Sequence, residues 1–69
     1  MLWEVKIFMN GKWIVSDILG SYIDCIGELV DLKEKGWLFD GLAIVLYCEQ
    51  GISFLKSDDL EEELKSLEL

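Results

Sequence analysis

Two segments of the chain are built on one plan, and this plan constrains the fold more than any other feature. Each runs from a strand-like stretch through a turn ending in glycine to a second strand-like stretch, a Ser-Asp pair and a helix-like stretch. The turns begin at Asn10 and Gln50, and the Ser-Asp pairs begin at Ser16 and Ser57. Side chains elsewhere do not match, so the halves share a construction without a demonstrable repeat. The plan predicts an α+β fold in the order ββα-ββα. Its antiparallel sheet has four to five strands in two hairpins, with both helices packed on one face.

The first hairpin is predicted from alternating hydrophobicity. Apolar residues occupy the odd positions of 3–9, and Glu4 and Lys6 lie between them, as in a half-buried strand. Asn10-Gly11 follows as a strong hairpin-turn signal. The chain then returns as a second strand over 12–16.

Two registers of this hairpin are open, one with a two-residue turn and one with a three-residue loop over 9–11. The three-residue loop pairs Ile7 with Trp13 and separates apolar from polar side chains better, so we expect this register. It leaves Phe8 and Ile14 together on the more polar face.

The rest of the chain continues the plan within a single domain, residues 1–69. The predicted elements are a helix capped by Ser16-Asp17 or Ser21 and ended by Gly36, a short strand at 37–39, strands at 42–49 and 52–56, and a final helix capped by Ser57 or Asp58.

The charge balance indicates what the protein can bind. Fourteen acidic residues stand against six basic ones, there is no histidine or arginine, and the formal net charge is −8. Nucleic acids and anionic membrane surfaces attract cations, so we expect neither direct nucleic-acid binding nor membrane binding. A basic surface on another protein is the partner that this charge favours.

The acidic residues gather in two predicted helices. Asp24, Glu28 and Asp31 recur at i, i+4 and i+7 and therefore share one helix face. The second cluster surrounds the start of the final helix and includes Asp58, Glu61 and Glu62. A solvated helix face explains the first cluster and the helix dipole explains much of the second, but together they also fit one negative docking surface.

Catalytic and metal-binding chemistry is poorly represented. Cys25 and Cys48 are the only candidate nucleophiles, and no histidine or arginine is present to activate a thiol. Ligand spacings typical of zinc or calcium and a glycine-rich phosphate loop are both lacking. We expect a protein that is not an enzyme and uses no metal or cofactor, with two reduced, buried cysteines.

The apolar content, 52%, exceeds what so small a core can hide, so we expect exposed apolar surface and a homodimer. Phe8, Ile14 and Trp37 are the candidate apolar interface. The N-terminal stretch lacks the pattern of a signal peptide, and the longest apolar run, 42–48, is far shorter than the roughly 20 residues of a membrane span, so we expect a cytoplasmic protein.

Two functions fit these observations. The first is a small acidic protein-binding module that docks on a basic partner surface. Its sharper form is an inhibitor that imitates the charge of a nucleic acid, of the kind that phages and mobile elements make. The second is a structural subunit of a homo-oligomer that assembles through exposed apolar surface.

Overall fold

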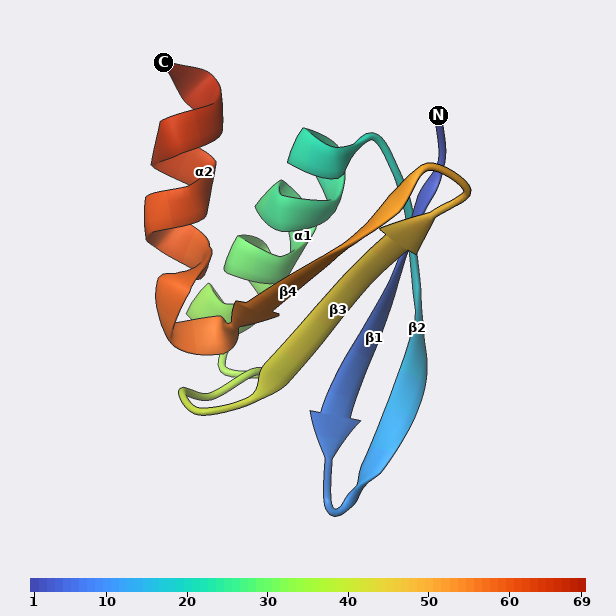
Figure 1. Cartoon of the computed structure of the whole chain (residues 1–69). Helices are drawn as coiled ribbons and strands as arrows, with labels where there is room; N and C mark the ends of the chain where they lie inside the picture. The colour runs from blue at the N-terminus through green and yellow to red at the C-terminus, as the bar shows by residue number, and fades with distance from the viewer.

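The computed structural model describes residues 1–69 and consists of two layers, a four-stranded antiparallel sheet and a pair of helices (Figure 1). The elements are β1 (Trp3–Met9), β2 (Lys12–Gly20), α1 (Tyr22–Glu34), β3 (Ala43–Cys48), β4 (Gly51–Lys56), a 3-10 turn (Ser57–Asp59) and α2 (Leu60–Glu68). The strand order in the sheet is β2-β1-β3-β4. Both helices lie on the same side of the sheet. The predicted α+β fold and its ββα-ββα order are therefore confirmed, with four strands.

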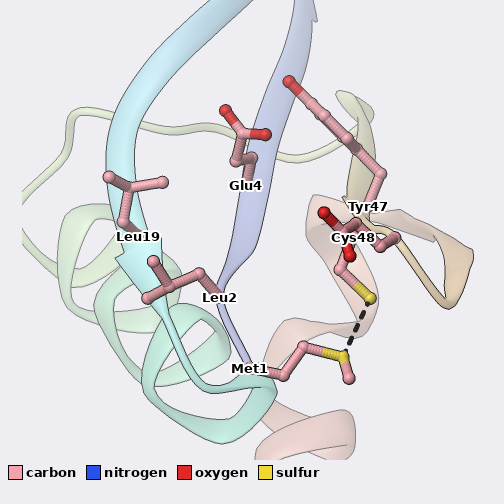
Figure 2. Close-up of a pocket in the computed structure, with 7 residues that line it drawn as sticks. Met1, Leu2, Glu4, Leu19, Tyr47 and Cys48 are labelled. Atoms are coloured by element: carbon pink, nitrogen blue, oxygen red, sulfur yellow. Dashed lines mark hydrogen bonds between the residues drawn. The ribbon is translucent and has the colours of Figure 1, made fainter.

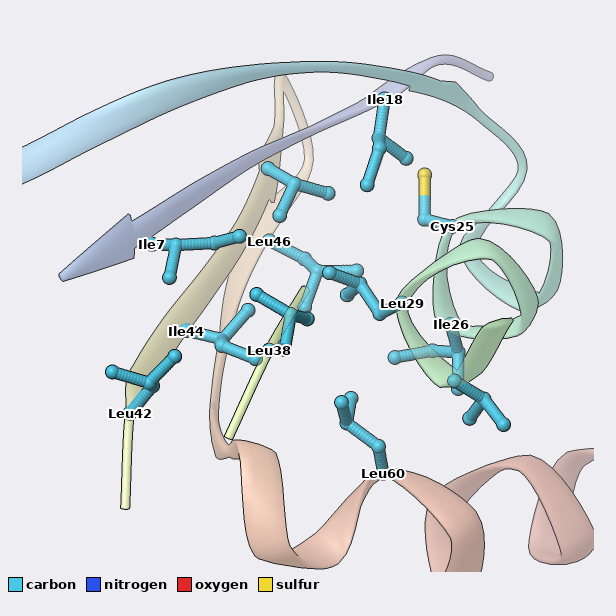
Figure 3. Packing of buried hydrophobic residues seen from close by; sticks show 12 residues of the cluster. Ile7, Ile18, Cys25, Ile26, Leu29, Leu38, Leu42, Ile44, Leu46 and Leu60 are labelled. Atoms are coloured by element: carbon cyan, nitrogen blue, oxygen red, sulfur yellow. The ribbon is translucent and has the colours of Figure 1, made fainter. Parts of the chain in front are cut away.

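A single apolar core joins the two layers (Figure 3). The sheet contributes residues such as Val5, Ile44 and Leu46, and α1 contributes a stripe that includes Ile26 and Leu29. From α2 only Leu60 is fully buried. These side chains point toward one another from the two layers, so the centre of the helix-facing side of the sheet is buried.

The main helix starts and stops where the sequence predicts. The Ser21 hydroxyl accepts a hydrogen bond from the Asp24 backbone N–H at 3.2 Å, which caps the first turn. Gly36 has a φ of 84°, the left-handed conformation that ends a helix at low cost for glycine. No helix of the protein is both long enough and apolar enough to cross a membrane.

The short strand predicted at 37–39 is wrong, because this segment consists of turns and bends. A buried serine holds it in place of a strand ladder. The Ser57 hydroxyl donates to the Phe39 carbonyl at 2.7 Å and accepts from the Leu42 N–H at 3.0 Å. Leu38 meanwhile fills the core. Since side-chain hydrogen bonds satisfy the backbone here, no sheet partner is needed.

The preferred register of the first hairpin is also wrong. Asn10 and Gly11 both have positive φ, 53° and 79°, as a two-residue type I′ turn requires. Phe8 therefore pairs with Trp13, and Ile7 pairs with Ile14. Ile14 thus lies on the helix-facing side of the sheet and does not share a face with Phe8.

A bulge in β2 then changes the pairing again. The Ser16 hydroxyl donates to the Val5 carbonyl at 3.0 Å and accepts from the Ile18 N–H at 3.2 Å, so a side chain replaces part of the backbone ladder. The register shifts there, and Leu19 pairs with Glu4. The bulge turns Ile18 into the core and leaves Leu19 on the opposite face.

Candidate functional site

The side of the sheet that faces away from the helices is not covered by any part of the chain, and we call it the open face. The strand pairings arrange its side chains in three rows across the sheet. The Glu4 row contains Leu19, Glu4, Tyr47 and Ile52. The Lys6 row contains Val15, Lys6, Val45 and Phe54. In the Phe8 row, Phe8 pairs with Trp13 and Ala43 pairs with Lys56, and continuation of the β1–β3 register sets the two pairs level.

Most of the open face is apolar and accessible to solvent. Phe54 is 74% exposed and Ile52 is 62% exposed on the edge strand β4, and Val15 is 61% exposed on the opposite edge strand β2. Leu19 and Trp13 are also exposed. An antiparallel sheet with one solvated side normally presents polar residues there. A large exposed apolar surface of this kind marks an interaction surface more often than a solvent face.

Two charged residues lie in the middle of this apolar surface. The Lys6 ammonium is positioned 5.1 Å from the centroid of the Tyr47 ring, in a cation–π arrangement that fixes it over the sheet. Glu4 precedes it by two residues on β1 and therefore lies on the same face, one row away. The centre of the open face thus carries one positive and one negative group side by side.

The two ends of the open face differ in shape. Beyond the Glu4 row lies a hollow of about 930 Å³, which is open to solvent (Figure 2). Its lining residues are Met1, Leu2, Glu4, Leu19, Tyr47, Cys48 and Glu49. At the opposite end, the Phe8 and Trp13 rings pack edge to face, with their centroids 5.1 Å apart. One end is therefore concave and the other carries an aromatic pair.

The predicted acidic residues of α1 lie on its solvent side. Asp24, Glu28 and Asp31 are all exposed. Asp31 forms an ion pair with Lys35 at 2.8 Å, whereas Asp24 and Glu28 form none. The Asp31 carboxylate holds the pKa of Lys35 above its ordinary value through this hydrogen bond.

The second acidic cluster is partly occupied by internal contacts. Lys33 of α1 lies 3.0 Å from Asp40 and 3.1 Å from Glu61, and its ammonium also donates to the Ser57 carbonyl. The hydrogen bond with Asp40 is the main reason that the pKa of Lys33 is raised. Asp58 accepts a hydrogen bond from the Gly41 N–H at 2.6 Å, which holds its pKa below the ordinary range.

The structure thus brings the two acidic helices to the same side of the sheet but gives Asp31, Asp58 and Glu61 structural partners. Glu62 is exposed and forms no ion pair. Of the predicted apolar interface, Phe8 lies on the open face, Ile14 does not, and Trp37 is exposed in the loop between α1 and β3.

Several open-face residues were missed by sequence reasoning. Ile52 and Phe54 alternate with Ser53 and Leu55, and the pattern alone does not say which pair points outward. The inward position of Ser53 becomes clear only from its hydrogen bond with the Tyr22 hydroxyl at 2.8 Å, a contact across the core. Ser53 thus turns inward and its apolar neighbours turn outward.

The two cysteine thiols and the Tyr22 hydroxyl show no sign of chemical activation. Burial is the main cause of a raised pKa at the Cys25 thiol, whose sulfur lies near the Trp3 and Gly20 carbonyls. The Cys48 thiol points to the Met1 sulfur at 3.4 Å. Burial likewise raises the pKa of Tyr22. No group of three or more cysteine or carboxylate side chains is placed to hold a metal ion.

Comparison of the chain with known protein families, with curated proteins and with solved structures finds no match. Its activity has to be inferred from the chemistry of its own surfaces.

Proposed function

We propose that the protein is a non-enzymatic protein-binding subunit that associates with another protein surface through its open face. The observation that carries this proposal is the uncovered sheet side, on which all four strands expose large apolar side chains around a central Glu4 and Lys6. A high net charge of −8 keeps such a surface soluble without hiding it.

The energetics favour association only with a well-fitted partner. Full burial of a Val, Leu, Ile or Phe side chain contributes about 1.5–3 kcal/mol. Six such side chains would contribute roughly 9–18 kcal/mol if they were fully exposed in the free chain, and roughly half of this, about 5–10 kcal/mol, because they are only about half exposed. Association itself costs about 4–15 kcal/mol in lost freedom. The two ranges overlap, so the matching of shape and charge decides which surface binds.

A photo-reactive side chain at position 54 tests this proposal. We expect Phe54 replaced by benzoylphenylalanine to form a cross-linked protein adduct in cells that naturally make the protein. The same group at Glu28, on the outer side of α1, is the control and should form little adduct. Mass spectrometry of the adduct identifies the contacting peptide. Adducts from position 28 alone would contradict binding through the open face.

The acidic helical layer supports a second candidate function, docking on a basic protein surface. Asp24, Glu28 and Glu62 are exposed and form no ion pair, so their charge is available to a partner. The sharper form, an inhibitor that imitates nucleic-acid charge, depends on the same residues.

Charge reversal tests this second function. We expect changing Asp24, Glu28 and Asp31 to lysine to weaken binding of a basic partner at least about tenfold at low salt, because their attraction is lost. The control changes three exposed acids outside α1, Asp17, Glu49 and Glu68, and so alters net charge equally. The measurement is the amount of partner that co-purifies at low salt and is released at high salt. Equal loss in both variants would argue for a diffuse charge effect and against docking through α1.

A further inference from the structure

We propose that the occupant of the open face is a second copy of the chain, seated face to face about a two-fold axis. The axis runs across the strands beside Val5, so that Glu4 of each copy meets Lys6 of the other. This inference rests on the proposed function of the open face and names its partner.

The net charge of the protein favours self-association through the open face over self-association through the helical layer. Each copy carries −8, so two copies repel each other unless they meet where acid is sparse. The helical layer carries the two acidic clusters and cannot serve. The three rows of the open face contain one acidic residue, Glu4, and two lysines, Lys6 and Lys56. A second acid, Asp17, is exposed in the bulge of the edge strand β2, between the Glu4 row and the Lys6 row. The open face is thus where like-charged copies can approach most closely.

The Glu4 row and the Lys6 row are complementary to each other. A two-fold rotation about an axis in the interface reverses the strand direction and lays the Glu4 row of one copy over the Lys6 row of the other. On β1 this places opposite charges together. On the other three strands it places apolar or aromatic side chains together: Leu19 with Val15, Tyr47 with Val45, and Ile52 with Phe54. Each contact therefore occurs twice, as an isologous interface requires.

The ends of the face fit under the same rotation. The Phe8 row of each copy comes to lie over the region beyond the Glu4 row of the other, where the hollow is found. The edge-to-face pair of Phe8 and Trp13 is a protruding apolar group, and Leu2 and Leu19 offer it an apolar lining (Figure 2). Lys56 moves toward the end that holds Glu49, which adds a second pairing of opposite charges. The protruding end of each copy therefore packs into the hollow end of the other.

The size of the face fits a small dimer interface. Its four strands lie about 4.7–4.9 Å apart and are six to nine residues long at about 3.4 Å per residue, so the sheet covers roughly 20 × 25 Å. This is roughly 500 Å² in projection per copy and about 1,000 Å² for the pair, which reaches the lower size limit of a specific interface. Two twisted sheets packed in this way keep their strands within about 30° of each other, so the row-on-row contact is retained.

Exchange of the two central charges tests the inference. Sedimentation velocity of the purified chain over a concentration series should show a species of twice 7.9 kDa. Glu4→Lys and Lys6→Glu should each weaken dimerisation at least about tenfold, because each sets like charges face to face. The double exchange, Glu4→Lys with Lys6→Glu, should restore it. The controls are Glu28→Lys and Lys65→Glu, which change net charge identically on the helical layer and should leave the dimer intact.

Two results would overturn the inference. A purely monomeric chain at about 100 μM would exclude self-association with a Kd in the micromolar range. Cross-linking of position 54 to another protein would still uphold the proposed function. A dimer in which the single reversals have no effect beyond their controls would place the interface elsewhere. Thermal melting of each variant checks that loss of the Lys6–Tyr47 contact has not unfolded the sheet.

Discussion

Changing both Val15 and Phe54 to lysine is expected to weaken association through the open face by at least about a hundredfold. The two positions flank the centre of the Lys6 row on opposite edge strands and are largely exposed in the single chain. Lysine at these exposed positions should leave the fold intact. Together with Lys6 it places three ammonium groups in one row, and association would bury all three. Unpaired buried charge costs several kcal/mol per ion. Sedimentation velocity at increasing concentration measures the loss.

The sign of the charge change distinguishes a loss of the interface from a general charge effect. The double substitution brings the net charge from −8 to −6, so general repulsion between copies decreases. The control, Trp37→Lys with Leu69→Lys, makes the same charge change at exposed apolar residues outside the sheet. It should leave association unchanged. If only the control abolished association, the loop of Trp37 would be the interface and the open face would not.

Local signals predicted most of the fold. Ser21, Asn10-Gly11 and Gly36 act through their own backbone conformation or through neighbours within three residues, so their roles follow from sequence. The segment 37–39 did not follow. Its backbone is held by Ser57, eighteen residues beyond Phe39, and no local pattern announces such a contact.

The apolar open face does not follow from the hydrophobic pattern of the first hairpin. That pattern favours the register that separates apolar from polar side chains, because a solvated sheet face is normally polar. The type I′ turn at Asn10-Gly11 and the bulge at Ser16 instead place Trp13 and Val15 with Phe8 on the outer side. The local turn chemistry was the better guide. Its conflict with the hydrophobic pattern is of the kind expected where a surface serves a partner and not the core.

The acidic residues show a similar division. Their helical spacing placed Asp24 and Glu28 correctly on a solvent side. The partners of Glu61 and Asp58 depend on how α1, α2 and the 40–42 loop meet in space. Only the folded chain distinguishes the carboxylates that hold these segments together from those that remain available for binding.

Replacement of Leu60 by alanine is expected to cost about 2–5 kcal/mol of the free energy of unfolding. The free energy of unfolding of a domain of this size is about 3–10 kcal/mol in total. If the substitution costs as much as about 5 kcal/mol, a large fraction of the molecules should be unfolded. Leu60 is the only fully buried residue of α2 (Figure 3), while Leu64 packs against the core in part. Urea denaturation followed by tryptophan fluorescence measures the change.

Leu67→Ala is the matched control, because it removes the same atoms from the same helix at a site that is 37% exposed. We expect a cost below about 1 kcal/mol there, since much of this side chain already contacts water. Equal costs at the two positions would show that α2 is held along its whole length and not at its first turn. In the expected case, α2 is anchored at Leu60 and by the contacts of Lys33 with Ser57 and Glu61. Its C-terminal half then remains the least constrained part of the helical layer, while the hydrogen-bonded sheet keeps the open face preorganised for its partner.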